Sequence, residues 1–362
     1  MEEWVNCTLG DLLTFQRGHD LPKSEMQSGE YPVVGSNGII GFHNEFTTNE
    51  PSVTIGRSGN VGNPFIYYGK TWSHNTTLYV KDFKGNDPVF IYYFLKTMDL
   101  SNYAGGSAVP TLNRNHIHTL PIRIPLNSQV QKKIGSLLKL FDDKIAENNS
   151  INENLAVLLQ TVYQERFGDV DKASKQGVLS DICSYSKDRV AVSELDVSTY
   201  FSTENMLPGK AGSTEATSLP TMPQTTACHK GDTLISNIRP YFKKIVYCED
   251  ECGCSTDVLC FMPNQPQYSA YLFSTLYADK FFAFMVAGAK GTKMPRGDKQ
   301  QIMTYPIVMP SEVALAEFNT IALPLIKQIY SNRAENKRLS LLRDTLLPKL
   351  MSGELDVSDI DL

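Results

Sequence analysis

The sequence predicts an α+β fold in which two mixed α/β domains are separated by two long helices of the coiled-coil type. Two observations lead to this prediction. The stretches 119–167 and 304–351 share one pattern, in which a proline-bracketed apolar segment precedes a long region with apolar residues at helical spacing. The stretches before them are instead rich in glycine turns and in β-branched and aromatic runs, which are typical of strands. The chain therefore contains the same plan twice.

The repeat is defined by matched positions at a nearly constant distance. Pro121 and Pro306 are 185 positions apart, whereas Asn148 and Asn332 are 184 apart, so a single one-residue gap aligns the two copies. Solenoid units run about 20–50 residues, so a period of this length indicates a duplicated domain with its helix. Two related but non-identical halves are expected to contact two related but non-identical targets.

Length and composition set the outer bounds of the prediction. At 362 residues the chain is too long for one ordinary domain, and no apolar run approaches the roughly 20 residues that span a bilayer. The N-terminus lacks the basic start and apolar stretch of a signal peptide, so we expect a cytoplasmic protein with reduced cysteines. The predicted segments are a first domain, a first long helix, a second domain, a second long helix and an acidic tail, at 1–125, 126–168, 169–310, 311–352 and 353–362.

The net charge of −5 is unlike that of a simple nucleic-acid binder, which usually has a basic domain. The charge is unevenly distributed, however. The stretch 287–301 carries four basic residues and one acidic residue, so a local basic strip is present. Such a strip can attract an anionic partner where the overall charge does not.

The first domain is predicted to contain short strands and one short helix. The runs 52–57, 63–69 and 76–82 have strand composition and are separated by glycine turns. In 88–100 the aromatic and apolar residues recur at helical spacing, which favours a short buried helix.

The region 127–167 is predicted to form one helix, because it has no proline and a single glycine. Its apolar residues follow a spacing of three and four positions, which is typical of a coiled coil. About 40 residues at about 1.5 Å each give a length of roughly 60 Å. The seam positions expected from this spacing are Val130, Ile134, Leu137, Phe141, Ile151, Leu155, Leu158 and Val162.

The second domain repeats this order. Segments 233–248 and 255–263 are predicted as strands around a turn, and 270–286 as one helix with an apolar side. The second long helix is expected over 312–350, with a kink at Pro324 because proline removes a backbone donor. Its expected seam positions are Phe318, Ala322, Leu325, Ile329, Leu339, Leu346 and Leu350.

Asparagines interrupt both seams. Asn148 falls on the first seam, Asn332 and Asn336 fall on the second, and Asn152 lies beside the first. A buried asparagine on such a seam costs stability but fixes register and partner orientation. The alternative is a solvated break where the helices separate, and the sequence leaves both interpretations open.

A glycine-rich loop precedes each proline-bracketed segment. Small residues in such loops let backbone amides approach phosphates, and basic side chains flank both copies, so we interpret them as DNA-binding loops. A tight loop needed only for the fold is the alternative. The candidate residues are Ser107, Thr111, Asn113 and Arg114 in the first copy and Lys290, Thr292, Lys293 and Arg296 in the second.

A second loop follows a predicted strand in each half. Arginine pairs bidentately with guanine and asparagine with adenine in the major groove, so loops of this composition can read bases. The alternative is a solvated hairpin tip. The candidate residues are Arg57, Ser58 and Asn60 in the first half and Arg239, Tyr241, Lys243 and Lys244 in the second.

Signatures of metal binding and catalysis are weak. Cys248, Cys252, Cys254 and Cys260 do not follow the usual spacing of two C-x2-C pairs for zinc, so we predict core residues and no metal site. No Walker loop, HExxH or GxSxG motif is present, nor the Asn/Asp-Pro-Pro-Tyr/Phe pattern of adenine methyltransferases. The sequence therefore favours a protein without catalytic activity of its own.

Over nearly its whole length the chain resembles the specificity subunit of Type I restriction–modification systems. The resemblance lies in the paired PIRIP and PIVMP segments at 121–125 and 306–310 and in the FDDKI pattern at 141–145. The LLPKLMSGEL segment at 346–355 resembles the usual ending of the family. The second copy departs from the pattern, with LIKQI at 325–329 in place of FDDKI, which we read as drift in the second repeat.

This resemblance implies a non-catalytic DNA-recognition subunit. Each domain would be a target-recognition domain that reads one half of an asymmetric bipartite sequence in double-stranded DNA. The two long helices would pair antiparallel about a pseudo-twofold axis and act as a spacer. Two modification (methyltransferase) subunits would dock on the chain and bind S-adenosylmethionine, so that no cofactor binds here. Cleavage would require a separate ATP-driven restriction subunit.

A protein of another class fits part of the pattern. A two-headed scaffold protein on a coiled-coil strut would share the repeat and the long helices. Such a protein would show no salt-dependent affinity for duplex DNA. An adenine methyltransferase encoded by the adjacent gene would favour the DNA-recognition subunit.

Overall fold

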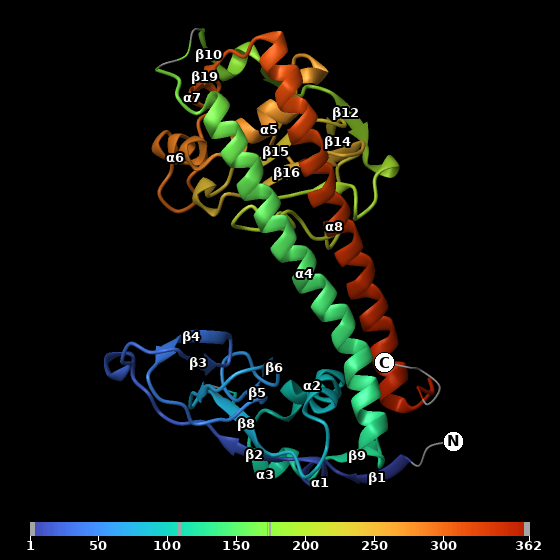
Figure 1. Ribbon diagram of the computed structural model, residues 1–362. Coiled ribbons are helices and arrows are strands. Elements are labelled where there is room, and N and C mark those ends of the chain that lie inside the picture. Colours follow the sequence, from blue (N-terminus) through green and yellow to red (C-terminus); the bar gives the residue numbers. More distant parts are fainter. Residues whose placement is uncertain (1–3, 107–109, 172, 174, 358–362) are drawn as a thin grey trace. The chain divides into compact units, whose positions relative to one another are not determined.

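The computed structural model describes residues 4–106, 110–171, 173 and 175–357 (Figure 1). The chain divides into two compact units, Met1–Glu147 with Asn336–Leu362, and Asn148–Glu335. The unit boundaries fall inside the two long helices, so each unit contains one globular domain and one end of each long helix. We call the globular domains head 1, up to residue 125, and head 2, residues 169–310.

The two long helices predicted from the sequence are present. α4 spans Ser128–Phe167 and α8 spans Glu312–Ser352. Within the second unit the side chain of Asn152 contacts Asn332, and that of Arg166 contacts Glu317. Residue numbers therefore rise along one helix as they fall along the other, so the helices run antiparallel in this unit.

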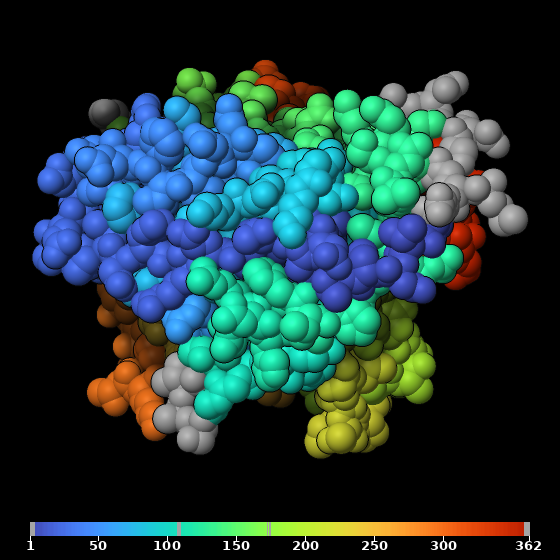
Figure 2. Space-filling model, turned by 90° about the horizontal axis from the view of Figure 1, so that it is seen from below, coloured from blue at the N-terminus to red at the C-terminus, as the bar shows by residue number. Residues whose placement is uncertain are grey.

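Head 1 begins and ends with paired strands. β1 (Trp4–Thr8) pairs antiparallel with β9 (Pro121–Pro125), which leads into α4. Figure 2 shows the face of the first unit on which the N-terminal residues, in dark blue, border the teal residues near β9. The other elements are a four-stranded sheet β2 (Thr14–Arg17), β8 (Thr77–Asp82), β5 (Ser52–Gly56) and β6 (Pro64–Tyr67), a three-stranded sheet β4 (Gly38–His43), β3 (Tyr31–Gly35) and β7 (Trp72–Ser73), and the helices α1 (Leu9–Leu12), α2 (Pro88–Thr97) and α3 (Arg114–Ile117). The three strands and the short helix predicted for this domain are confirmed as β5, β6, β8 and α2.

Helix α2 fastens head 1 to α4. The helix begins where the Asp87 carboxylate accepts a hydrogen bond from the backbone N–H of Phe90 at 2.8 Å, and Pro88 occupies the first turn, where no donor is required. The apolar side of α2 is buried in the core of the first unit. That core also contains Ile134 and Leu138 of α4. The predicted seam residue Ile134 thus shares a core with the head.

Gly135 lets α4 approach α2 closely. A Cβ atom at this position would lie 2.8 Å from the backbone nitrogen of Phe90, closer than real Cβ contacts. The clash in Gly135→Ala is expected to cost about 1–3 kcal/mol. The gain of about 1 kcal/mol in helix propensity offsets part of this, so the free energy of unfolding should fall by up to about 2 kcal/mol. Denaturant unfolding measures this difference. Gly69→Ala is the matched control, because a Cβ there meets nothing within 4 Å, and an equal loss in both variants would contradict the close contact.

Head 2 also begins and ends with paired strands. β10 (Gln176–Val178) pairs antiparallel with β19 (Pro306–Val308), which precedes α8. The other elements are a sheet of β11 (Cys183–Tyr185), β18 (Val258–Pro263), β15 (Thr233–Ser236) and β16 (Ile245–Tyr247), a sheet of β12 (Arg189–Ala191), β14 (Gln224–Cys228), β17 (Cys252–Cys254) and β13 (Tyr200–Phe201), and the helices α5 (Ser269–Tyr277), α6 (Asp279–Ala287) and α7 (Lys299–Met303). The predicted strands around a turn are confirmed as β15, β16 and β18.

The prediction of a single helix over 270–286 was wrong. α5 and α6 are separated at Ala278, whose backbone is extended with φ −64° and ψ 141°. The start of α6 is tied down because the Asp279 carboxylate accepts hydrogen bonds from Lys210 at 2.9 Å and Lys243 at 2.8 Å. Both helices bury apolar side chains in the same core, so their apolar spacing does not reveal a one-residue break.

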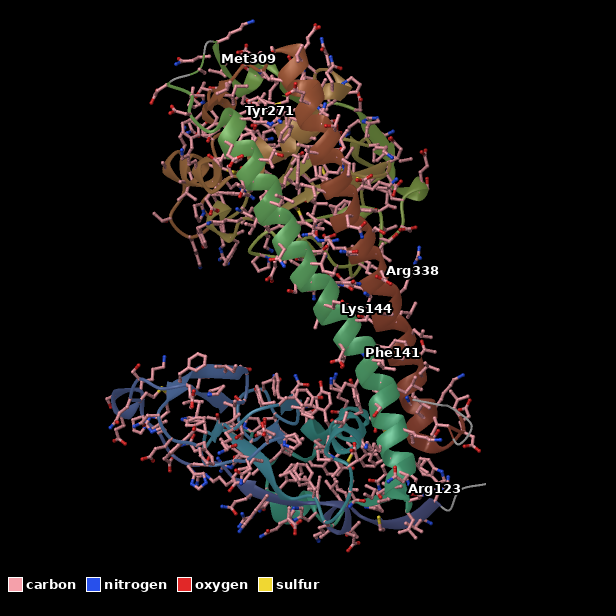
Figure 3. All side chains as sticks on the ribbon, viewed as in Figure 1. Arg123, Phe141, Lys144, Tyr271, Met309 and Arg338 are labelled. Carbon is pink, nitrogen blue, oxygen red and sulfur yellow. The ribbon has the colours of Figure 1, made fainter. Side chains whose placement is uncertain are left out.

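Aromatic side chains join head 2 to the ends of both long helices. Tyr271 of α5, labelled in Figure 3, packs on Phe167 of α4 with ring centroids 4.9 Å apart. Phe167 in turn packs on Phe318 of α8 with centroids 5.5 Å apart. Edge-on aromatic pairs of this kind add stability beyond the area that they bury. The second unit is therefore one core shared by the head and both helices.

The buried side of α4 differs in part from the predicted seam. Leu138, Leu159 and Tyr163 are buried, whereas the predicted seam residues Ile151 and Leu158 are exposed. The physical reason is that each head covers a second side of the helix. The spacing rule for a two-helix seam therefore predicts the wrong residues where the helix also contacts a head.

The sequence predicted a kink in α8 and an acidic tail after it. α8 is continuous through Pro324, and the kink there stays a prediction. The acidic tail over 353–362 stays a prediction, and within it Val357 is buried in the core of the first unit. Gly353, with φ +78°, ends the helix and lies against the ring of Trp4, where a Cβ would come within 2.6 Å. Residues 358–362 lie outside the described residues.

Candidate nucleic-acid interface

The two loops predicted as binding loops in head 1 lie against each other. Ser58, after β5, forms a β-bridge with Thr111, and the backbone N–H of Leu112 donates to the carbonyl of Arg57 at 2.9 Å. Thr111 also exchanges backbone hydrogen bonds of 2.9 and 3.0 Å with Gly105. We call this surface loop pair 1, which comprises residues 57–62 with 105–106 and 110–114.

The corresponding loops of head 2 meet in the same way. The backbone N–H of Arg239 donates to the carbonyl of Pro295 at 2.8 Å. Arg296 exchanges two backbone hydrogen bonds of 2.9 Å with Lys290 and forms a β-bridge with Ile238. We call this surface loop pair 2, which comprises residues 237–244 with 288–298. Two motifs predicted separately thus form one surface in each head.

The backbone of loop pair 2 is held in an unfavourable conformation. Arg239 and Lys243 have φ values of +50° and +52°, in the left-handed region that residues with a side chain rarely adopt. Backbone hydrogen bonds keep them there, from Lys243 to Pro240 at 2.9 Å and from Lys210 to Lys243 at 3.0 Å. Strain of this kind persists where the surrounding structure imposes it, and it clusters at binding sites.

Four of the predicted basic residues in loop pair 2 have partners within the chain. The partners are Asp298 at 2.5 Å for Lys290, Asp257 at 3.0 Å for Arg296, Asp279 at 2.8 Å for Lys243 and the carbonyl of Thr203 at 2.6 Å for Lys244. The hydrogen bond from Lys290 lowers the pKa of Asp298, and the bonds from Lys243 and Lys210 lower the pKa of Asp279 to about 2. Burial lowers the pKa of Lys244. These basic side chains therefore hold the loops in place through ion pairs and a hydrogen bond, in addition to giving the loops positive charge.

Of the remaining predicted residues of loop pair 2, Arg239 is half-buried and three are exposed. The three are Tyr241, Thr292 and Lys293, and Met294 is exposed beside them. An exposed ammonium group and an exposed aromatic ring, which packs on Phe242 with ring centroids 4.8 Å apart, are available to phosphates and bases. Within loop pair 2 these side chains are therefore the strongest candidates for contact with nucleic acid.

The predicted residues of loop pair 1 have mixed roles. Arg114 is exposed, whereas the Asn113 side chain caps α3 by accepting a hydrogen bond from the backbone N–H of Asn115 at 3.0 Å. Arg57 donates to the carbonyl of Asn75 at 3.5 Å, and Asn60 accepts from Asn63 at 3.3 Å. Ser107 lies outside the described residues. Arg114 is the member of this group that is most available to a ligand.

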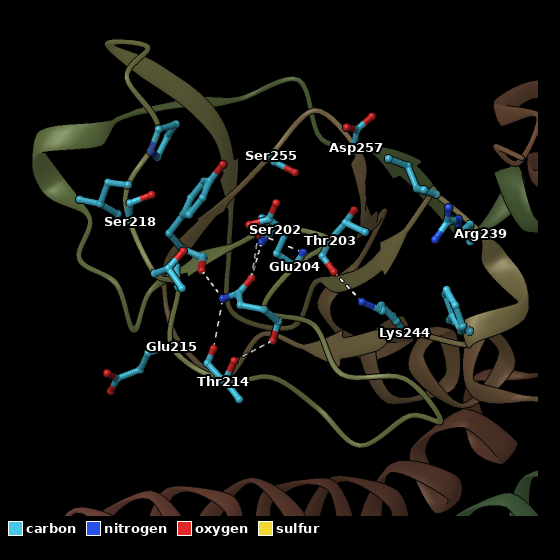
Figure 4. A pocket seen from close by; sticks show the side chains of 18 of the residues that line it. Ser202, Thr203, Glu204, Thr214, Glu215, Ser218, Arg239, Lys244, Ser255 and Asp257 are labelled. Atoms are coloured by element: carbon cyan, nitrogen blue, oxygen red, sulfur yellow. Dashed lines mark hydrogen bonds between the residues drawn. The ribbon is translucent and has the colours of Figure 1, made fainter. Parts of the chain in front are cut away.

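A hollow of about 700 Å³ adjoins loop pair 2 (Figure 4). Its lining carries both charges, with Arg239 and Lys244 on one part and Glu204, Glu215 and Asp257 on others. Figure 4 shows the hydrogen bond from Lys244 to the backbone of Thr203 at its wall. Sequence reasoning missed this hollow, because the segment 200–220 that forms most of it has no recognisable motif.

The cysteines predicted as core residues lie in an apolar core of head 2. Cys248, Cys252, Cys254 and Cys260 are buried there together with Cys228. The sulfur atoms of Cys248 and Cys252 are 3.5 Å apart. Across the residues that the structure describes, no group of three or more histidine, cysteine, aspartate or glutamate side chains is arranged to hold a metal ion.

Comparison with known proteins shows what the chain is similar to. Residues 1–156 match the model of the Type I restriction modification DNA specificity domain. The specificity subunit of the Type I restriction enzyme MjaIX from Methanocaldococcus jannaschii is 24% identical over 302 residues, which cover 75% of this chain and 70% of that protein. The chain is therefore similar to the specificity subunits of Type I restriction–modification systems, and its residues 1–156 match their DNA specificity domain.

Further relatives agree with this similarity. The EcoprrI specificity subunit of Escherichia coli is 28% identical over 152 residues, which cover 40% of this chain and 37% of that protein. The crystal structure of the Type I restriction–modification S subunit from M. genitalium superimposes with a TM-score of 0.67 at 17% identity and covers 97% of this subunit and 96% of that chain. The two therefore share a fold, which is mixed α/β with long helices.

Each long helix of the subunit carries an exposed apolar pair. Val157 and Leu158 on α4 are 65% and 47% exposed, and Leu341 and Leu342 on α8 are 70% and 47% exposed. The two pairs are 184 positions apart, so they occupy equivalent places in the repeat. Exposed apolar groups of this size commonly mark protein interaction sites.

Among the described helices none is both long and apolar enough to cross a membrane.

Proposed function

We propose that this subunit reads an asymmetric bipartite target in double-stranded DNA, with loop pair 1 contacting one half-site and loop pair 2 the other. The shared backbone pattern of the two loop pairs, which is built from different side chains, is the observation that carries the proposal. A common backbone geometry lets both heads approach DNA in the same way, whereas side chains determine which bases are read. Unlike side chains therefore imply unlike half-sites.

The two halves are proposed to be a pseudo-twofold repeat with the long helices as spacer. In both heads the first strand is followed by the same hydrogen bond, in which an aspartate carboxylate accepts from the backbone N–H three residues before it. The Asp11 carboxylate accepts a hydrogen bond from the backbone N–H of Thr8 at 2.9 Å, and Asp181 accepts one from Val178 at 2.8 Å. A repeat that keeps such small features supports two heads of common origin and common orientation toward their ligand.

The asparagines of the long helices are proposed to set the spacer register. Asn332 donates to Asn152 at 2.9 Å, and Asn148 donates to Glu335 at 2.8 Å. Asn148, Asn152 and Asn332 are all buried, so a shift in register would leave them without these partners. This supports the register interpretation over a solvated break. It also shows that Asn152, expected beside the seam, lies within it.

Two modification subunits are proposed to dock on the long helices. The equivalent exposed pairs Val157–Leu158 and Leu341–Leu342 support this, because one partner surface can use the same apolar pair twice. The modification subunits would bind S-adenosylmethionine and transfer the methyl group, and this subunit would bring them to the target. Cleavage, in systems that cleave, would come from a separate restriction subunit.

Exchange of one head tests the division of labour. We expect that replacing residues 1–125 by those of a relative with another target, in the complex with its modification subunits, changes one half of the methylated sequence. Sequencing of methylated bases in genomic DNA reads out both halves and the gap between them.

The reciprocal exchange of residues 169–310 is the control, and it should change the other half only. A change in both halves, or in neither, would rule out the modular assignment. A complex without salt-dependent affinity for duplex DNA would instead favour a two-headed scaffold protein.

A further inference from the structure

Asp142 of α4 is the meeting point of three elements within the first unit. The guanidinium group of Arg343 on α8 donates to one carboxylate oxygen. The hydroxyl of Tyr93 on α2 donates to the other at 2.5 Å. The Asp142 and Arg343 side chains are 30% and 18% exposed, and Tyr93 is fully buried. Burial and the bond to Asp142 raise the pKa of Tyr93, so its hydroxyl remains a donor.

The repeat places apolar residues at the positions equivalent to this ion pair. With the offset of 184, Asp142 corresponds to Ile326 and Arg343 corresponds to Leu159. Ile326 and Leu159 are both buried in the core of the second unit. The same pair of helix positions is therefore charged in one unit and apolar in the other.

This difference matters because α4 and α8 are similar enough to pair with their own kind. In the same antiparallel register, α4 of one chain against α4 of a second copy would bring Asp142 against Leu159. Likewise, α8 against α8 would bring Arg343 against Ile326. Each arrangement separates Asp142 from Arg343 and places a half-buried charged group against an apolar side chain, although Arg343 keeps its neighbour Asp344. Burying a charge with fewer partners is unfavourable.

The pair of asparagines Asn152 and Asn332 does not make this distinction. Asn148 and Asn152 on α4 match Asn332 and Asn336 on α8 at the same offset, so the contact between Asn152 and Asn332 would be replaced by another asparagine pair in either pairing. The bond from Asn148 to Glu335 would be lost in an α4–α4 pairing, because the equivalent of Glu335 is Ile151. Asn152 and Asn332 fix register, whereas the choice of partner must come from positions at which the helices differ. We propose that Asp142 and Arg343 form a pairing-specificity element, which directs α4 to α8 and rejects a like helix of a second copy.

The test uses the full chain and asks which helices meet. Tyr93→Phe/Asp142→Ile/Arg343→Leu removes the ion pair and the donor together and makes the first unit resemble the second. Ile151→Cys supplies a thiol near the centre of an α4–α4 pairing, in a Cys7→Ser background. Cys7 is the only cysteine in the described chain that is not buried. A short bismaleimide then joins two chains only where two α4 helices lie together.

We expect the cross-linked dimer to increase by about tenfold or more over the chain with the ion pair intact, while circular dichroism shows a folded protein. Lys139→Gln/Asp143→Asn is the matched control. It removes the exposed ion pair between Lys139 and Asp143 on one side of α4, which plays no part in the choice of partner. This control should cross-link at the background level.

Two outcomes overturn the proposal. One is a folded triple variant that cross-links no more than the parent chain. The other is an equal increase in the Lys139→Gln/Asp143→Asn control, which would assign the effect to the general charge of the helix. The test involves neither DNA nor a modification subunit, so its result is independent of the proposed function.

Discussion

Val157→Asp/Leu158→Asp is expected to reduce the number of bound modification subunits from two to one. When Leu341→Asp/Leu342→Asp is combined with these two changes, the number of bound modification subunits is expected to fall to zero. A carboxylate buried against an apolar partner surface loses its hydration without compensation. Substitution at the centre of an interface commonly costs about 2–4 kcal/mol, so we expect a loss of about 30-fold or more in affinity at each altered site.

Native mass spectrometry of the complex counts the bound subunits directly. Because all four side chains are exposed, thermal unfolding of the isolated subunit should change little. Val313→Asp is the matched control. Val313 is also on α8 and is 69% exposed, but its equivalent in the first copy is Gln129, so it belongs to no repeated apolar pair. Loss of both partners from a change on one helix would contradict two equivalent docking sites.

Tyr241→Ala/Lys293→Ala is expected to weaken DNA binding by the complex by about 30-fold or more. Loss of a ring that stacks on a base costs about 1–3 kcal/mol, and loss of a phosphate contact lowers affinity for all sequences. The slope of log affinity against log salt concentration should also fall by about 0.9 in magnitude, because one fewer counterion is released. Fluorescence anisotropy over a range of salt concentrations measures both quantities.

The control for this prediction is Lys187→Ala, which removes an exposed lysine of head 2 far along the chain from loop pair 2. It should leave the salt dependence unchanged. An equal loss of affinity in the control would mean that overall charge, and not loop pair 2, determines binding. Arg296→Ala is a poorer test, because Arg296 is bound to Asp257 and its loss would disturb the loop itself.

Much of the fold could be predicted because its signals are local. The spacing of apolar residues predicted both long helices to within a few residues of their ends. The composition of short runs predicted the central strands of both heads. The break between α5 and α6 was missed, because Ala278 differs from its neighbours only in backbone conformation.

The candidate site could be predicted only in part. Both loops of each pair were identified by their glycines and basic residues, but not their contact with each other. Ser58 and Thr111 are joined by backbone groups, which every residue other than proline offers, so no side chain in the sequence marks the pairing. The internal ion pairs of Lys290 and Arg296 were missed because their partners are ordinary surface acids.

The sequence by itself determined the repeated pattern of residues, the two long helices and the asparagines shared by both, because these are properties of spacing along the chain. The tertiary structure decided which side of each helix is buried and which residue meets which. It exposed Leu158, which spacing had placed on the seam, and it paired Asp142 with Arg343. The reason is physical: burial and ion pairing depend on which distant segments arrive at the same place, and apolar spacing within one helix does not contain that information.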